Sequence, residues 1–298
     1  MGEQSPAHSI TKRRGKMLRA KYMQNAPDGN GTLFRGDMYQ VPIMGRLGGV
    51  TGQRIWETNL VAQYTPGTRL VLGDGRVFRY AKASNIITRS DFGVRFWGLS
   101  SDGIEDSTSQ AQAVGDTSIV LPTTTAFTKD ELRGGYVMIH IAAHFQNRGI
   151  LGNDAMSGNF ITIYLSEPLT VAVGASQYTE VYPNPYNNVR DTFSMGDPNG
   201  RYSSVAGIPF IITSVANSYL WIQTWGPVFV NPHGALGVTT ISDVRVVVFD
   251  MEGGISYDQD VRGFLADSVS QHQRAGFIIN NQTDSIAGSP VIMLQISP

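Results

Sequence analysis

The chain has 298 residues, of which 16% are charged, and it contains 33 glycines, 14 prolines and no cysteine. A typical soluble domain has about a quarter of its residues charged, so much of this surface has to be covered by uncharged polar side chains. The absence of cysteine excludes disulfides and thiolate metal sites, so packing or assembly has to stabilise the fold. This composition is typical of β-sandwiches, viral shells and assemblies that bury much of their surface in neighbours. The length suits one large β domain or two smaller ones.

The residues after Met1 are polar and basic, without the apolar segment of a secretory signal peptide. No apolar run is long enough to span a bilayer. Position six is proline, where myristoylation requires serine or threonine. We therefore expect a protein made in a cytoplasm, without a membrane partner.

Residues 1–55 differ from the rest of the chain and predict an extended basic N-terminal arm. Glycine and turn formers dominate Asn25–Thr32 and Arg46–Val50, and six of the 23 basic residues fall within residues 12–21. Three interpretations remain open: contact with a partner subunit, sequence-independent attraction to nucleic-acid phosphates, or a solvated tail. We favour partner contact, made by Lys12, Arg13, Arg14, Lys16, Arg19 and Lys21.

Residues 56–298 predict an all-β body, a sandwich, jelly-roll-like fold or barrel of about a dozen short strands at roughly ten-residue spacing. No long amphipathic helix is evident, and the polar stretch 187–204 is where the body would divide if it forms two packed β subdomains. The expected strands are Leu60–Tyr64, Thr68–Leu72, Val77–Tyr80, Thr117–Leu121, Tyr136–Ala142, Asn159–Leu165, Leu169–Val173, Gln177–Tyr182, Gly207–Val215, Ser218–Val230, Ala235–Ile241, Val244–Phe249, Gly276–Asn281 and Val291–Ile296.

Three local patterns refine this prediction. Gly73-Asp74-Gly75-Arg76 predicts a hairpin turn, because glycine accepts positive φ. Thr128, with Glu131 three residues later, has the pattern of a capping box and predicts one helical turn. The polar stretch Ser100–Gln112 predicts a loop.

The stretch Ser218–Val230 contains Trp221 and Trp225. Because alternate residues of a strand point to opposite faces, Tyr219, Trp221, Gln223 and Trp225 share one face. We expect a central strand that ends at Gly226-Pro227, because proline cannot donate to a ladder. The aromatic rings on this side of the strand could stack a sugar ring. We favour instead a position in the core or in a subunit interface for Tyr136, Tyr219, Trp221 and Trp225.

Candidate chemical sites are weak throughout. His140 and His144 have the spacing of a zinc pair on a helix but lie on or just past a predicted strand. Asp28–Thr32 resembles the start of a calcium loop without its closing glutamate, and Arg35–Asp37 matches a cell-adhesion tripeptide that recurs by chance. We therefore expect no metal site, no cofactor and no enzymatic activity. The loop carboxylates show no pairing typical of catalysis: Asp102, Glu105, Asp106, Asp191 and Asp197.

A series of motifs is similar to those of virion structural proteins of tailed bacteriophages, a diffuse set seen in marine and environmental phages. The resemblance spans about residues 64–298. It implies a chain of small β elements in a virion component and carries over no catalytic residues. The motifs are Tyr64–Arg69, Gly73–Ala83, Tyr136–His140, Ile161–Val173, Asn184–Tyr186, Trp221–Pro227 and Pro290–Ile296.

Together these features predict a capsid decoration or cement protein, located on the virion and assembled in the host cytoplasm. The partner expected of a decoration protein is the major capsid protein. Self-association, as a trimer, is expected by analogy with β proteins at threefold points of shells. Two alternatives remain open: a neck, tail or major shell component of the virion, and a carbohydrate-binding attachment module.

Overall fold

The computed structural model describes ten segments of the chain: residues 52–96, 104–107, 110–141, 144–175, 177–191, 204–232, 245–250, 252–257, 273–280 and 290–298. The predicted arm lies outside these segments except for residues 52–55. The expected strand Ala235–Ile241 also lies outside them.

The described segments confirm the all-β prediction. They contain sixteen strands in two sheets, more than the dozen expected, and one short 3-10 helix, η2 (Pro185–Asn187). The chain enters the ten-stranded sheet, then builds the whole six-stranded sheet from residues 104–182, and then returns to the first sheet.

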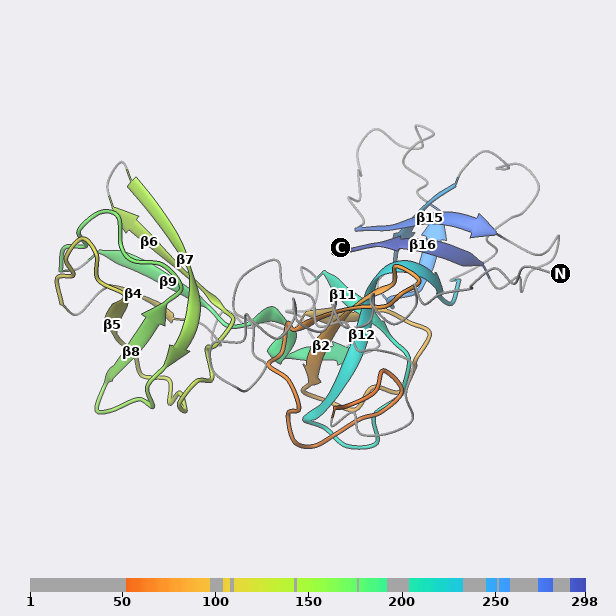
Figure 1. The fold of residues 1–298 in the computed structure, drawn as a ribbon, viewed down its shortest axis with the longest axis horizontal. Helices are drawn as coiled ribbons and strands as arrows, with labels where there is room; N and C mark the ends of the chain where they lie inside the picture. Colours follow the sequence, from red (N-terminus) through yellow and green to blue (C-terminus); the bar gives the residue numbers. More distant parts are fainter. Residues whose placement is uncertain are drawn as a thin grey trace, which may run out of the picture. The chain divides into compact units, whose positions relative to one another are not determined.

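The six-stranded sheet has the order β4-β9-β6-β7-β8-β5, and every pairing in it is antiparallel. Its edge strands β4 and β5 contact each other, so the sheet curls around one apolar core (Figure 1). Inward residues such as Ile119, Val137, Ile139 and Ile161 alternate with exposed ones, as a half-buried strand requires. The strands are β4 (Ile104–Ser107), β5 (Ser118–Pro122), β6 (Tyr136–Ile141), β7 (His144–Asn153), β8 (Phe160–Leu165) and β9 (Tyr178–Tyr182).

The ten-stranded sheet has the order β1-β2-β10-β3-β11-β12-β16-β15-β13-β14, with a further pairing between β2 and β12. This pairing closes β2, β10, β3, β11 and β12 into a ring, and small residues such as Ala81, Ala83 and Ala206 fill its narrow interior. The strands are β1 (Arg69–Val71), β2 (Val77–Ala83), β3 (Val94–Phe96), β10 (Val189–Asp191), β11 (Val205–Pro209), β12 (Ser218–Phe229), β13 (Val246–Phe249), β14 (Ile255–Tyr257), β15 (Arg274–Asn280) and β16 (Val291–Gln295).

Strand β12 joins the closed ring to β16, β15, β13 and β14, whereas β1 pairs with β2. Its first half pairs with β2 and its second half with β16 (Figure 1). Between the halves the register with β2 shifts, and Gly226 adopts a φ of +98°. The buried Gln223 amide donates to the carbonyls of Trp225 (2.9 Å) and Pro227 (3.0 Å), which holds this bend.

The expected end of this strand at Gly226-Pro227 was therefore wrong. Pro227 lies opposite Met293, and the strand runs on to Phe229. The pairing with β2 ends at Trp225, so Pro227 lies past that ladder and its missing N–H donor removes no bond to β2.

Two other expected strands are irregular segments. Leu60–Tyr64 forms no ladder, and only the neighbouring Asn59 makes an isolated bridge, to Tyr219. In Leu169–Val173, the end residues pack individually into the core of the six-stranded sheet, while the buried side chain of Gln146 bonds the backbone of residues 170 and 171. Burial of single side chains thus explains the apolar pattern of Leu169–Val173, whereas Leu60 and Val61 are exposed and their apolar run marks neither a strand nor a core.

Three further local predictions were wrong. Part of the expected loop Ser100–Gln112 is strand β4, because it pairs with β9. Strand β7 was not expected, since its buried Gln146 is polar while the apolar Phe145 and Leu151 are exposed, which breaks the usual alternation. Thr128 does donate to the Glu131 carboxylate from its backbone N (2.7 Å), but Asp130 has a φ of +62°, which ends any helix, and turns follow.

The hairpin at Gly73–Arg76 is confirmed. Strands β1 and β2 pair antiparallel on either side of it, and Gly75 has a φ of +86°.

Candidate functional site

Trp221 lies in a buried aromatic cluster on one face of the closed ring. Its indole packs against Tyr80 (centroids 5.0 Å apart) and Tyr64 (5.3 Å), while Tyr219 stacks on Tyr80 at 5.8 Å. Only 2% of the surface of Trp221 is exposed to solvent. Leu220, the next residue back along the strand, has the opposite parity and points into the ring. The predicted alternation therefore holds for this part of β12.

The buried Gln53 connects this cluster to the segment before β1. Its side chain accepts from the Tyr80 hydroxyl (2.6 Å) and donates to the carbonyl of Tyr219 (2.6 Å), while its own carbonyl accepts from Trp221 Nε1 (3.0 Å). Burial raises the pKa of Tyr80 to about 12. These bonds satisfy the polar atoms that the aromatic side chains bring into the interior.

Trp225 does not join this cluster. It follows the register shift of β12, is half-buried, and is absent from the residues that pack around Trp221. The expected common face of the two tryptophans, and with it a sugar platform made by both, is therefore wrong.

Tyr136 lies on the outer surface of the six-stranded sheet rather than in its core, with 50% of its surface exposed. It is the cross-strand partner of Tyr182, which is similarly exposed. On the same face, His140 lies between Phe145 (ring centroids 4.8 Å) and Tyr178 (5.2 Å). We call Tyr136, His140, Phe145, Tyr178 and Tyr182 the aromatic face.

The other sequence candidates divide into two groups. His140 and His144 lie on the two strands of the β6–β7 hairpin, and His140 packs between aromatic rings. Asp191 is buried, accepts from the backbone N (2.9 Å) and hydroxyl (2.7 Å) of Thr88, and has a structural role. Within the described segments, no group of three or more histidine, aspartate and glutamate side chains is placed to hold a metal ion. The second group lies outside the described segments and comprises all six basic arm residues, the calcium-like and adhesion patterns, Asp102 and Asp197. Glu105 and Asp106 lie in β4, but their side chains are not described.

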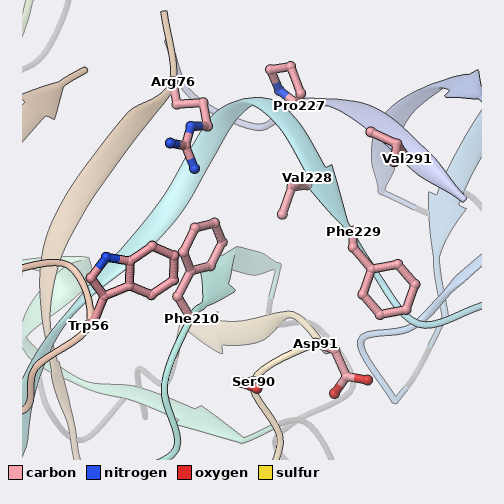
Figure 2. A pocket seen from close by; sticks show the side chains of 9 residues that line it. All are labelled: Trp56, Arg76, Ser90, Asp91, Phe210, Pro227, Val228, Phe229 and Val291. Carbon is pink, nitrogen blue, oxygen red and sulfur yellow. The ribbon is translucent and has the colours of Figure 1, made fainter. Parts of the chain in front are cut away.

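A cleft of about 440 Å³ lies beside the bend of β12 (Figure 2). Its walls come from segments far apart in the sequence: the residues before β1, the β2–β3 connection, the residue after β11, and strands β12 and β16. Trp56 stacks on Phe210 with centroids 5.1 Å apart and planes at 26°. The lining residues are Trp56, Arg76, Ser90, Asp91, Phe210, Pro227, Val228, Phe229 and Val291.

The two charged groups of the cleft are held by neighbours. Arg76 Nε lies 2.7 Å from an Asp74 carboxylate oxygen, and its guanidinium lies 5.9 Å from the Phe78 ring centroid. Asp91 accepts a hydrogen bond from Asn231 Nδ2 at 3.0 Å. Figure 2 shows Arg76 and Asp91 on opposite sides of the opening, with Val228 between them.

Sequence reasoning did not find this cleft. Trp56 appeared only as the start of the body, and Phe210 and Phe229 carried no pattern of their own. A lone exposed tryptophan was the only signal available, and its meaning depends on neighbours that the fold brings together.

Comparisons of the chain with protein-family models, with curated proteins and with solved structures found no match. In the described segments, no helix is long and apolar enough to cross a membrane.

Proposed function

We propose that this chain is a non-enzymatic structural protein of a virion, of the capsid decoration type, which self-associates through the aromatic face and attaches to the shell through its basic residues 12–21. The observation that carries the proposal is the aromatic face. It places four large aromatic side chains, each 45–54% exposed, and one histidine on three adjacent strands: Tyr136, His140, Phe145, Tyr178 and Tyr182.

Such a face suits a protein surface as its partner. Tyrosine and phenylalanine are enriched in interfaces, and tyrosine contributes large contact area at a low cost in side-chain entropy. A contiguous exposed aromatic patch on a soluble monomer is unusual, so burial against a second copy accounts for it. Cross-strand and edge-on ring contacts also fix the side chains before binding, which lowers the cost of ordering them.

A combination of two contacts suits a shell protein. The aromatic face would join copies into a trimer, and each copy would contribute one basic segment toward the major capsid protein. Linked weak contacts multiply affinity through effective concentration. The shell gains cross-links between its subunits without any catalytic chemistry.

Self-association is tested by light scattering on the purified full chain. The wild type is expected at three times the chain mass of 32.4 kDa. The double variant Tyr136→Ser/Tyr182→Ser should dissociate to monomers with its circular dichroism unchanged. The control is Tyr164→Ser, which removes a similarly exposed tyrosine from β8. A monomeric wild type, or a double variant that stays trimeric, would refute the role of this face.

Attachment is tested on virions that encode the chain. The copy number of a decoration protein per virion should be close to the copy number of the main shell subunit. A neck or tail component would have a far lower copy number. Deletion of residues 1–24 should abolish binding to stripped particles and leave self-association intact. A truncated protein that still saturates the particles would show that the arm does not attach the body.

A further inference from the structure

We propose that the cleft beside β12 binds a pyranose ring of a glycan. This inference does not depend on the proposed function, because the cleft shares no residue with the aromatic face. Its volume of about 440 Å³ lies within the roughly 300–1,000 Å³ of small-ligand sites.

The cleft has a pre-oriented aromatic wall. Trp56 is 57% exposed, yet its indole is stacked on Phe210, which in turn meets the edge of Phe78 at 5.3 Å and 89°. The contact with Phe210 occupies one side of the indole and fixes its direction. An exposed tryptophan held in this way presents a flat apolar surface without a large ordering cost on binding.

The cleft also combines apolar surface with separated polar groups. Val228 and Phe229 add apolar surface, while Arg76 and Asp91 stand on opposite sides of the opening (Figure 2). Arg76 supplies N–H donors and Asp91 supplies acceptors, and Ser90 can do either. Arg76 donates to Asp74 and Asn231 donates to Asp91, and these two bonds hold both charged groups in place before a ligand arrives.

A pyranose matches this arrangement better than other small ligands. Its C–H face is apolar and can cover the indole, while its hydroxyls donate to a carboxylate and accept from a guanidinium. A purely apolar ligand would cover Arg76 and Asp91 without adding hydrogen bonds to those with Asp74 and Asn231, which is costly. A phosphorylated or otherwise anionic ligand would meet the Asp91 carboxylate.

The experiment uses the full chain on a printed array of neutral and acidic oligosaccharides, followed by titration of the best binder. Trp56→Ala should weaken binding by at least about tenfold, whereas Trp56→Phe should retain most of it. Asp91→Asn, which conserves shape, should weaken binding by removing the acceptor charge. Tyr164→Ala is the control, because it removes an exposed aromatic side chain on β8, outside the cleft.

Circular dichroism and thermal melting establish that each variant is folded. If Trp56→Ala does not fold, Asp91→Asn and Ser90→Ala provide the same comparison. No binding of the wild type to any glycan on the array would overturn the proposal. Binding that is unaffected by the cleft variants would overturn it as well, as would displacement of the cleft ligand by peptides but not by free sugars.

Discussion

Replacement of Trp221 by alanine tests the role of β12 most directly. A buried aromatic side chain removes about 150–250 Å² from water, which at about 25 cal/mol per Å² corresponds to roughly 4–6 kcal/mol. This is an upper figure, because the unfolded chain also buries part of that surface. Trp221 is 2% exposed and donates to the Gln53 carbonyl, so we expect Trp221→Ala to cost about 3–5 kcal/mol in unfolding free energy.

The assay is urea unfolding followed by far-UV circular dichroism, since the substitution itself alters tryptophan fluorescence. The matched control is Trp56→Ala, which removes an exposed indole and its one stacking contact and should cost about 1 kcal/mol. Trp221→Phe should lie between the two, because it keeps an aromatic ring and loses the Nε1 donor. If Trp221→Ala costs no more than the Trp56 control, the aromatic cluster does not stabilise the body as we argue.

Two further predictions concern the bend of β12 and the buried tyrosine of the same cluster. Gly226→Ala should destabilise the protein by about 1–2 kcal/mol, because the φ of +98° disfavours a side chain and an added Cβ would lie 3.1 Å from Arg76 Cα. The measurement is chemical unfolding. The control is Gly73→Ala, whose added Cβ would meet no atom within 4 Å. For Tyr80, burial raises the folded-state pKa to about 12 from its ordinary value of 10.0, so the unfolded chain loses its proton first as pH rises. Its contribution to stability is therefore complete below pH 10 and declines between about pH 10 and 12. Tyr80→Phe should lower stability at neutral pH and flatten this alkaline decline; an unchanged alkaline slope would show that another group is responsible.

Much of the local structure followed from the sequence alone. The hairpin at Gly73–Arg76 could be predicted because glycine accepts the positive φ that Gly75 adopts there. Alternation placed Tyr219 and Trp221 on one face of β12 and Leu220 on the other, because the period of a strand is a local property of the backbone. The all-β class followed in the same way, from short apolar runs separated by turn residues.

The pairing of distant strands was decided by the tertiary structure. The closure of the ring by β2 and β12 joins segments about 140 residues apart, and no local pattern specifies such a partner. The passage of β12 through Gly226-Pro227 depends on Gln223 and on β16, so the two residues that signal a strand end instead mark a bend. The pairing of distant strands also brings Trp56, Phe210 and Phe229 to one cleft. In the other sheet Tyr136 stays on the surface, because burial is a property of the packed sheets and not of the residue.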